Sequence, residues 1–417
     1  MPSGDSAARG AKAALVVLTL INLFNYLDRY VVASLVESLK KSELALSDAQ
    51  AGSLMTGFVI VYMLTSPIFG SLGDRRKRPP LLALGVGVWS LATALGGLAR
   101  SFWGLFAARA AVGVGEAAYG TIAPALLADF FPKDRRGRVF AIFFAAIPIG
   151  SAAGYALGGL MDQKFGWRSA FLVAGLPGLA LALLCLGLKD PPRGSQDEGG
   201  ELAPPASPRD GRISAAYSRL WRNRAYRLTV LGYAAYTFAL GGLAFWAPAF
   251  FERVRGMSKS DATVQFGAIV VATGFIGTFG GGWAGDWFLR RSKEGYLLFS
   301  GWVTLAAAPA ALVGFLSPKP AIFMPAIVVT ELLLFASTGP INSAIVNVVA
   351  PGERATAVAL SILAIHLLGD VPSPPLIGIV SDATSLGKAF LTLPAVIALA
   401  GAIWLYAAKT ARDPARG

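Results

Sequence analysis

Four charged residues interrupt stretches that are otherwise apolar, and their spacing brings two acids and two bases to a similar depth. Asp28 and Arg29 lie past the middle of the first long apolar run, and Arg109 and Glu116 lie in the fourth. Seven residues of α-helix place Arg109 and Glu116 on one face, about 10 Å apart along the axis. Counted from the ends of their runs, Asp28 falls in depth between Arg109 and Glu116. Because an ionisable side chain in lipid costs at least about 3 kcal/mol, these groups should face one another or a wet cavity.

The chemistry that this group of charges suggests is proton binding. Our hypothesis is that Asp28 and Glu116 are the protonation sites, with Arg109 as their shared partner and Arg29 as the second base. The charge of a carboxylate depends on its hydration and on neighbouring arginines, so a change in hydration can move a proton. Protonation would free an arginine to bind an anionic headgroup, or would release one half of a gate from the other. The alternative is a permanent ion-pair network that only pins the two helices together.

The elements that position these charges are long apolar segments. Of the 417 residues, 55% are hydrophobic and 15% are charged, and apolar runs of membrane-spanning length recur throughout. Only helices satisfy their own backbone groups in lipid, so the sequence predicts an all-α membrane protein with twelve transmembrane helices in two pseudo-symmetric six-helix bundles. The expected spans are 13–36, 50–72, 80–99, 102–130, 136–161, 169–188, 226–251, 264–288, 295–316, 321–349, 355–380 and 388–408.

One long polar stretch separates the two sets of six spans. It is rich in proline, glycine and acidic residues, as flexible linkers are. We therefore expect bundles at 1–189 and 226–417, joined by a cytoplasmic linker at 190–225. Its end, Arg219 to Arg227, is basic, with Trp221 and Tyr226 interleaved. Such segments contact nucleic acid or anionic lipid headgroups, and beside a membrane the lipid interpretation is favoured, with no nucleic acid as partner.

The distribution of Lys and Arg predicts the orientation in the membrane. With the N-terminus inside, inner segments hold 25 of the 37 basic residues and outer loops hold 10. This asymmetry places both termini in the cytoplasm. The short tails and the Ala, Gly and Arg content suggest a bacterial inner membrane, and we expect a monomer.

The second half of the chain repeats the first. Gly70-Ser-Leu-Gly-Asp74 closes span two, and Gly282-Trp-Ala-Gly-Asp286 closes span eight at an offset of 212. Gly158 to Asp162 closes span five, and Gly378 to Asp382 closes span eleven at an offset of 220. A parallel repeat of six spans is typical of transporters that rock two halves about a central site.

These motifs carry a resemblance to a known family. The segment Gly70 to Arg78 resembles the loop signature of the major facilitator superfamily, with Lys77 in place of the usual glycine. Arg109 to Gly115 resembles the span-four motif of that family. The series Pro148, Gly150, Gly154, Gly158 and Gly159 resembles its span-five antiporter motif. More narrowly, Asn25 to Arg29 with Gly115-Glu116-Ala117 is similar to the Spinster branch, which implies proton-linked movement of sphingosine phosphate, lysophospholipids or related amphiphiles.

The signature loop is also a candidate gate. Asp74 could bond the N-terminus of span eleven, near Glu353 to Ala355, and pair with Arg135. A carboxylate is favoured at a helix N-terminus by about 0.3–1 kcal/mol. The resemblance implies that this network latches the cytoplasmic side, and the alternative is a solvated basic loop that sets topology alone. The expected gate residues are Gly70, Asp74, Arg75, Arg78, Arg135 and, as the second-half copy of Asp74, Asp286.

Other polar residues inside the spans are candidates for substrate contact. The expected substrate-binding residues are Arg109, Asn25, Tyr26, Tyr119, Glu331, Thr338 and Asn342. Packing between helices is the alternative for those in span ten. His366 and Asp370 are spaced to share a helix face, as a second titrating pair or as a locally satisfied donor. The prolines that follow Asp370 should bend span eleven.

Three functional classes differ in the sequence features that they require. The chain has no phosphate-binding loop for ATP, and the half-repeat with charged mid-membrane residues favours a secondary transporter of protons and a small amphiphilic or organic substrate. One cysteine, Cys185, and one histidine leave little from which to build an enzyme, a metal site or a cofactor site. A channel would be expected to carry a short selectivity loop. The alternative within transport is a proton-linked exporter of drugs or small organic solutes.

Overall fold

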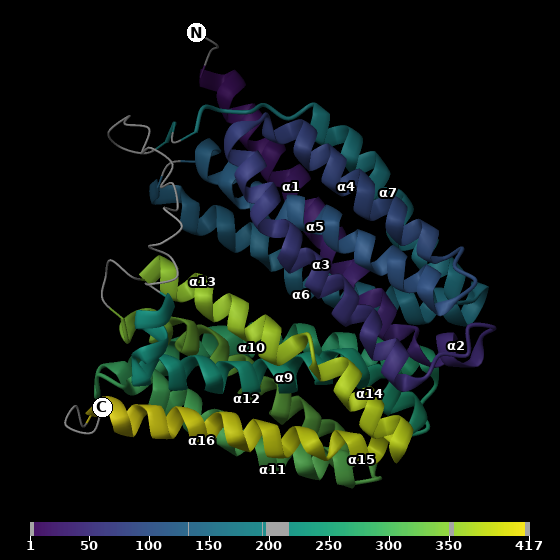
Figure 1. Ribbon diagram of the computed structural model, residues 1–417, viewed down its shortest axis with the longest axis vertical. Coiled ribbons are helices and arrows are strands. Elements are labelled where there is room, and N and C mark those ends of the chain that lie inside the picture. The colour runs from purple at the N-terminus through teal and green to yellow at the C-terminus, as the bar shows by residue number, and fades with distance from the viewer. Residues whose placement is uncertain (1–3, 132, 194, 197–216, 350–353, 413–417) are drawn as a thin grey trace. The chain divides into compact units, whose positions relative to one another are not determined.

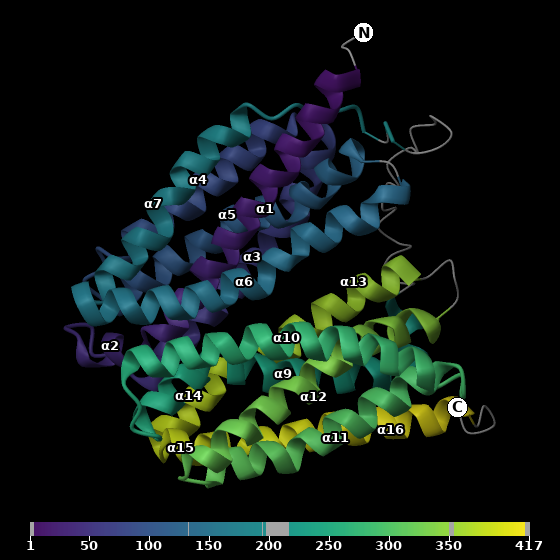
Figure 2. The same cartoon turned by 180° about the vertical axis from the view of Figure 1, so that it is seen from behind.

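The computed structural model describes residues 4–131, 133–193, 195–196, 217–349 and 354–412. In this part of the chain every regular element is a helix, and twelve helical segments are long and apolar enough to cross a membrane. The expectation of an all-α membrane protein with twelve transmembrane helices is therefore confirmed (Figures 1 and 2). Large apolar side chains such as Leu64, Trp103 and Leu183 are more than half exposed, as lipid-facing residues are.

The first half of the chain forms the helices drawn from purple through blue to dark teal in Figure 1. Their bounds are α1 Gly4–Ser34, α2 Val36–Lys41, α3 Asp48–Arg75, α4 Arg78–Gly96, α5 Phe102–Phe130, α6 Lys133–Phe165 and α7 Trp167–Leu186.

The second half forms the helices drawn from teal to yellow. Their bounds are α9 Arg224–Arg253, α10 Lys259–Leu289, α11 Gly295–Leu316, α12 Pro320–Asn347, α13 Arg354–Ile365, η2 His366–Asp370, α14 Ser373–Ala383, α15 Leu386–Phe390 and α16 Thr392–Arg412.

The chain divides into two compact units, which are described separately below. Unit 1 comprises Met1–Leu46, Ser53–Ala206 and Ser258–Gly267, and unit 2 comprises Ser47–Gly52, Ser207–Met257 and Ala268–Gly417. The division differs from the sequence halves at two short segments. The first turn of α3 is grouped with unit 2, and the start of α10 is grouped with unit 1.

The two units pair their helices in the same way. In unit 1, α1 packs on α6, and α4 packs on both α5 and α7. In unit 2, α9 packs on α13, η2 and α14, and α11 packs on both α12 and α16. The helices of these pairs correspond through the repeat, as the pseudo-symmetric bundles predicted from the sequence require.

Glycines allow the close helix contacts of unit 1. A Cβ atom on Gly154 of α6 would lie 2.4 Å from the carbonyl oxygen of Leu27 in α1. A Cβ atom on Gly113 of α5 would lie 2.5 Å from the carbonyl oxygen of Phe58 in α3. Both contacts need a residue without a side chain. One sets α6 against α1, which carries Asp28 and Arg29, and the other sets α3 against α5, which carries Arg109 and Glu116.

The eleventh span is interrupted, as the proline-rich sequence after Asp370 predicted. The helix α13 passes into the π-helical turn η2, which ends at Asp370, and α14 begins at Ser373 with prolines in its first turn. A proline cannot donate a backbone hydrogen bond, so the regular ladder stops here. The π-helical turn places both His366 and Asp370 at the interruption.

Candidate functional site

Helices α1 and α5 bring Asp28 and Arg109 together inside unit 1. Nη1 of Arg109 lies 3.3 Å from each carboxylate oxygen of Asp28. Asp28 is 0% exposed and Arg109 is 1% exposed, so this ion pair is sealed from the surface. Desolvation offsets most of the attraction in such a pair, so net stability alone is a weak reason for its presence.

A second pair, Arg29 with Glu116, joins the same two helices. Nη2 of Arg29 lies 2.6 Å from Oε2 of Glu116. Glu116 is fully buried, whereas 20% of the Arg29 side chain is exposed. The guanidinium also lies 4.9 Å from the ring centre of Tyr26 and 5.0 Å from that of Phe58, within the range of a cation–π interaction.

This pairing differs from the expectation that Arg109 is shared by both acids. Each acid has its own arginine: Asp28 bonds Arg109, and Glu116 bonds Arg29. The reason is that consecutive residues of an α-helix point about 100° apart. Asp28 and Arg29 therefore reach different partners, although they are neighbours in α1.

Three polar atoms of these pairs have no hydrogen-bond partner among the described residues. They are Oε1 of Glu116, Nε of Arg29 and Nε of Arg109. An unsatisfied buried polar atom costs about 1–3 kcal/mol. The arrangement therefore has unused hydrogen-bonding capacity, which a proton, water or a ligand can use.

A cavity of about 220 Å³ in unit 1 reaches the second pair. The residues that line it are Asn22, Asn25, Tyr26, Arg29, Tyr62, Glu116, Tyr119, Gly120, Pro124, Phe143 and Phe144. Its wall combines one cation, one acid, two amides and several aromatic rings. Polar groups in a mostly apolar wall are typical of small-molecule sites.

The structure brings together several of the predicted site residues at this cavity. Asn25, Tyr26 and Tyr119, predicted to contact substrate, all line it, as do Arg29 and Glu116. Arg109 and Asp28 are not among the lining residues. Asp28 lies one position before Arg29 on α1, and its side chain pairs with Arg109 away from the cavity wall.

Sequence reasoning missed Asn22 and Phe143. The amide of Asn22 donates to the backbone oxygen of Phe143 at 2.9 Å, which ties α1 to α6 beside the cavity. The available signal was helical spacing, because residues 22, 25, 26 and 29 recur at intervals that place them on one face of α1. Phe143 carried no such signal.

The predicted polar residues of α12 form a separate cluster in unit 2. The hydroxyl of Tyr236 donates to the backbone oxygen of Leu334 at 2.7 Å and lies 3.1 Å from the hydroxyl of Thr338. The amide of Asn342 donates to the hydroxyl of Tyr233 at 3.2 Å. Thr338 and Asn342 thus face the tyrosines of α9 and serve at least in helix packing.

Glu331 is the single acidic residue of α12, and it is buried. It is 1% exposed, and its Oε2 atom has no hydrogen-bond partner among the described residues. Glu331 also forms no ion pair with any of the described residues. Its predicted contact with substrate stays a prediction.

The pair predicted in span eleven is formed. Nδ1 of His366 lies 3.0 Å from Oδ1 and 2.9 Å from Oδ2 of Asp370. Both side chains are partly exposed, at 28% and 21%. Whether the pair titrates during function stays a prediction.

Arg78, one of the predicted gate residues, is the centre of a buried network at one end of unit 1. It lies 2.5 Å from Asp129 at the end of α5 and 2.7 Å from Asp190 after α7. It also donates to the backbone oxygen of Pro191 at 2.7 Å. Arg193 then donates to the backbone oxygen of Gly73 in the last turn of α3 at 2.7 Å.

The other predicted gate residues are described to different extents. Gly70 lines a cavity of about 240 Å³ next to Arg78. Arg75 is the exposed last residue of α3. Asp286 accepts a hydrogen bond of 2.7 Å from the hydroxyl of Tyr296. The side chains of Asp74 and Arg135 lie outside the described residues, as does the start of span eleven near Glu353, so the expected latch stays a prediction.

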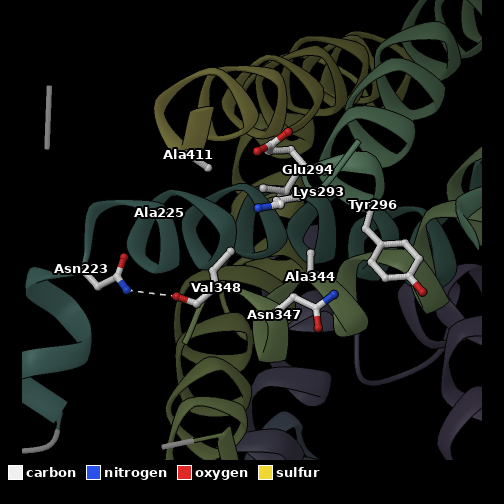
Figure 3. A pocket seen from close by; sticks show the side chains of 10 residues that line it. Asn223, Ala225, Lys293, Glu294, Tyr296, Ala344, Asn347, Val348 and Ala411 are labelled. Carbon is white, nitrogen blue, oxygen red and sulfur yellow. Dashed lines mark hydrogen bonds between the residues drawn. The ribbon is translucent and has the colours of Figure 1, made fainter. Parts of the chain in front are cut away.

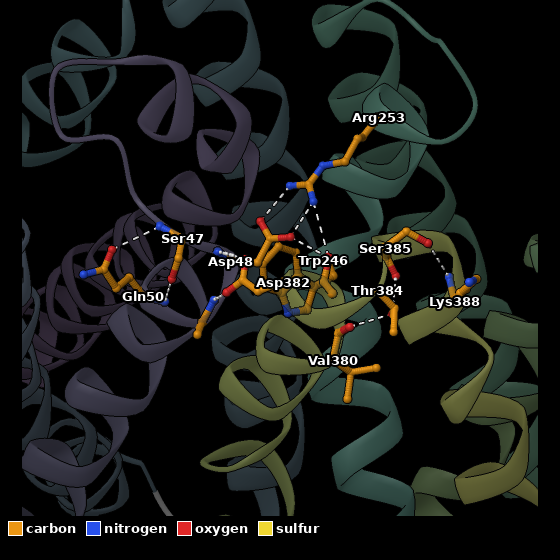
Figure 4. A network of polar contacts seen from close by, with 12 residues as sticks. Ser47, Asp48, Gln50, Trp246, Arg253, Val380, Asp382, Thr384, Ser385 and Lys388 are labelled. Atoms are coloured by element: carbon orange, nitrogen blue, oxygen red, sulfur yellow. Dashed lines mark hydrogen bonds and ion pairs between the residues drawn. The ribbon is translucent and has the colours of Figure 1, made fainter.

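A polar network that the sequence did not predict lies at the start of α3, within unit 2 (Figure 4). Arg253 lies 2.5 Å and 2.9 Å from the two carboxylate oxygens of Asp48, and Ser381 donates to Asp48 at 2.5 Å. The carboxylate of Asp382 accepts the backbone N–H groups of Asp48 and Ala49, each at 2.8 Å. Asp382 therefore caps the N-terminus of α3.

The repeat counterpart of Asp382 makes a different set of contacts in unit 1. Asp162 lies 2.7 Å from the ammonium of Lys259 and accepts a hydrogen bond of 2.5 Å from Ser38. Lys259 is the first residue of α10, as Asp48 is the first residue of α3. The repeated aspartates thus both bind the start of a helix that is distant in sequence.

Comparison with known proteins identifies the class to which this fold and this site belong. A sequence model described as the Major Facilitator Superfamily matches residues 18–374. That range covers most of the chain and eleven of its twelve spans in whole or in part. The chain therefore belongs to the Major Facilitator Superfamily, as a Spinster-like transporter of the membrane.

The branch follows from curated relatives. The chain is 35% identical over 411 residues to protein spinster homolog 3 of Danio rerio, covering 92% of this chain and 81% of that protein. It is 36% identical over 400 residues to protein spinster homolog 1 of Homo sapiens, covering 91% and 74%. Protein spinster of Drosophila melanogaster is 34% identical over 390 residues, and the chain spans 63% of its length.

Solved structures share the fold. A bacterial homologue of the human lysosomal transporter Spinster, in an inward-facing and unoccupied conformation, superposes with a TM-score of 0.84 at 24% identity, covering 96% of this chain and 97% of that one. A D-xylose–proton symporter superposes with a TM-score of 0.71 at 18% identity, covering 94% and 96%. At these identities the likeness concerns the fold alone.

Proposed function

We propose that this protein is a proton-coupled secondary active transporter that moves an amphiphilic, lipid-like substrate by rocker-switch alternating access. The substrate class is that of sphingosine phosphate or a lysophospholipid. The observation that carries the proposal is the Arg29–Glu116 pair at the wall of the unit 1 cavity, where one carboxylate oxygen of Glu116 has no hydrogen-bond partner among the described residues. The Spinster resemblance supports the substrate class.

In this proposal Arg29 binds the anionic headgroup. It is the one arginine in the cavity wall, it is partly exposed, and aromatic rings hold its guanidinium in place. Arginine presents a fork of donors that suits phosphate. The tyrosines and phenylalanines of the same wall would contact the apolar part of the substrate.

The coupling step is a competition for Arg29. When Glu116 is ionised, its carboxylate occupies the guanidinium at 2.6 Å. When Glu116 takes up a proton, it loses the charge that holds Arg29, and an anionic headgroup can take its place. Proton binding and substrate binding are then linked through a shared group, and the linkage is reciprocal.

Asp28 and Arg109 form the second site of the proposed coupling. They lie on the same two helices as the first pair but are sealed from the surface. Protonation of Asp28 would leave Arg109 without its partner and would favour rearrangement of α1 against α5.

We further propose that the protein is a monomer in a bacterial inner membrane. The charge asymmetry of the loops supports the placement of both termini on the cytoplasmic side. Transport of this kind needs no catalytic step and no cofactor.

The test is a proteoliposome assay with the full chain and a fluorescent lysolipid or sphingosine phosphate, with and without an imposed proton gradient. The wild type is compared with Asp28→Asn, Glu116→Gln and the control Glu43→Gln. Glu43 is an exposed acid that pairs with Arg168, so the control removes an ion pair of similar chemistry outside the cavity.

We expect gradient-driven lipid movement in the wild type and in Glu43→Gln, and its loss in both Asp28→Asn and Glu116→Gln. Movement of a small cationic dye with no lipid movement would favour the alternative of a drug or small-solute exporter. A wild-type response to the gradient in Asp28→Asn and Glu116→Gln would remove both acids from the mechanism.

A further inference from the structure

Unit 2 has a cavity at the end where α9 and α11 begin and α12 ends (Figure 3). Its volume is about 390 Å³, within the range of roughly 300–1,000 Å³ that is typical of small-molecule sites. The polar part of its wall includes Asn223, Lys293, Tyr296 and Asn347, and the apolar part includes Leu297 and Val348. A wall with both kinds of side chain suits a ligand that is itself part polar and part apolar.

Lys293 is the one basic residue of this wall, and its charge has no protein partner. The side chain is exposed and forms no ion pair with any described residue. Glu294 also lines the cavity, but its Oε2 atom accepts a hydrogen bond of 2.6 Å from the hydroxyl of Ser292. Lys293 therefore brings a positive charge that an anion from outside the described chain can bind.

The corresponding end of unit 1 neutralises its cation with acids of the protein. There Arg78, the first residue of α4, lies 2.5 Å from Asp129 and 2.7 Å from Asp190. In unit 2 the last residue of α12 is Asn347, whereas Asp129 is next to the last residue of α5. An amide does not neutralise a lysine, but it can donate a hydrogen bond to an anion.

Two pairs of an arginine with an aromatic ring adjoin the cavity in the sequence. The guanidinium of Arg291, two residues before Lys293, lies 3.1 Å from the ring centre of Trp287. Arg224, next to Asn223, donates to the hydroxyl of Tyr406 at 2.5 Å. Both rings are nearly half exposed. Exposed Trp and Tyr side chains of membrane helices lie at the level of the lipid headgroups, so the cavity is at headgroup depth.

We propose that this cavity binds the phosphate headgroup of an anionic membrane phospholipid. Lys293 pairs with the phosphate, and the amide of Asn347 donates a hydrogen bond to it. Leu297 and Val348 contact the glycerol part of the lipid. In Figure 3 Lys293, from the turn before α11, lies above Val348 and Asn347 of α12. The site lies in unit 2 and has no role in the proposed transport, so its test does not depend on the transported substrate.

Hydrogen exchange of the full chain in lipid nanodiscs tests the proposal. The nanodiscs contain either phosphatidylcholine alone or phosphatidylcholine mixed with phosphatidylglycerol, and a third sample adds inorganic phosphate to phosphatidylcholine alone. The amides of 294–297, at the start of α11, report on the cavity. Those of 320–324, at the opposite end of α12, serve as the reference. We expect phosphatidylglycerol to slow exchange at 294–297 about fivefold or more, because binding stabilises the site that it occupies.

The variant Lys293→Glu is compared with the control Lys319→Glu. Both lysines are exposed, and Lys319 directly precedes α12 at its other end, so the charge change is the same in a different place. We expect Lys293→Glu to lose the effect of phosphatidylglycerol at 294–297 and Lys319→Glu to keep it. A second variant, Asn347→Asp, supplies the acid that unit 1 has at Asp129 and should also weaken the effect.

Three results would overturn the proposal. The first is an equal effect of phosphatidylglycerol in the wild type and in Lys293→Glu. The second is loss of the effect in Lys319→Glu as well, which would indicate a general response to surface charge. The third is the same slowing with inorganic phosphate alone, which would assign the cavity to a soluble anion instead of a lipid.

Discussion

Arg29 and Glu116 are bonded at 2.6 Å across α1 and α5, and they are the only charged pair in the wall of the described unit 1 cavity. In the neighbouring pair, Asp28 and Arg109 lie 3.3 Å apart, and both side chains are buried. Two pairs of the same chemistry therefore differ in access. In the proposed function, Arg29 and Glu116 therefore bind the substrate and the proton at the cavity. Asp28 and Arg109 take part through the rearrangement of α1 against α5.

Replacing Arg29 by Lys tests the headgroup site. Lysine keeps the charge but loses the planar fork and the stacking on Tyr26 and Phe58. We expect the apparent KM for an anionic lysolipid to rise roughly tenfold, which is about 1.4 kcal/mol, with little change in maximal rate. Uptake against substrate concentration in proteoliposomes measures both values.

The matched control is Arg168→Lys. Arg168 also stacks on an aromatic ring, that of Trp167, and also pairs with an acid, but it lies outside the cavity. Its KM should stay at the wild-type value. A KM that rises equally in both variants would mean that Arg29 acts through general stability rather than through substrate contact.

The fold was largely predictable from the sequence, and the pairing of the charges was not. Twelve apolar runs and the repeated motifs are enough to predict the helices, because a backbone in lipid must form its hydrogen bonds within its own segment. The partners of Asp28 and Glu116 depend on the rotation of α1 about its axis, and in the structure Leu27 of α1 faces Gly154 of α6. A one-dimensional pattern places residues on a face but does not say which neighbour that face meets.

The network at Asp48 shows a second limit of sequence reasoning. In the sequence, Asp48 and Arg253 lie just outside the expected spans 50–72 and 226–251, and no motif marks either residue. Their contact joins residues 205 positions apart and needs the end of α14 as a third member. Asp382 was visible as a repeated motif residue, but its capping of α3 follows only from the three-dimensional arrangement.

Replacing Arg78 by Ala should destabilise unit 1 strongly. Arg78 is 2% exposed and bonds Asp129, Asp190 and the backbone of Pro191. Removing one member of a buried ion-pair network leaves the other charges uncompensated, at a cost of about 3–5 kcal/mol. The Tm of the purified protein in detergent measures the loss.

Arg75→Ala is the control for this change, since Arg75 is the exposed last residue of the preceding helix α3. An exposed substitution of this kind should change stability by less than about 0.5 kcal/mol. If both variants melt at the same temperature as the wild type, the Arg78 network does not hold unit 1 together.

Two glycine-to-alanine changes should differ in their effect on thermal stability. At Gly154 a new Cβ would lie 2.4 Å from the backbone oxygen of Leu27, so α1 and α6 must move apart. At Gly70 no atom lies within 4 Å of the new Cβ. Alanine favours the helix by about 1 kcal/mol over glycine, so Gly70→Ala should be neutral or stabilising.

Thermal unfolding of the two variants in the same detergent checks this pair. We expect a lower Tm for Gly154→Ala and an equal or higher Tm for Gly70→Ala. A gain in stability at Gly154 would contradict the close approach of α1 and α6 in unit 1.

The N-terminal cap of α3 gives the last prediction. Both carboxylate oxygens of Asp382 accept backbone N–H groups, those of Asp48 and Ala49 at 2.8 Å each. Asp382→Ala removes both bonds and should cost about 1–2 kcal/mol, and Asp382→Asn keeps one acceptor and should cost less. Hydrogen exchange of the amides in the first turn of α3 should rise in the same order.

Ser385→Ala separates this effect from a general loosening of the same region. Ser385 caps α15, where its hydroxyl accepts the backbone N–H of Lys388 at 3.3 Å, and this cap lies on a different helix from the one at Asp48 and Ala49. Its replacement should raise exchange in α15 and leave the first turn of α3 unchanged. Faster exchange at Asp48 and Ala49 in Ser385→Ala, at the level seen in Asp382→Ala, would mean that Asp382 acts on the whole region rather than as a cap of α3.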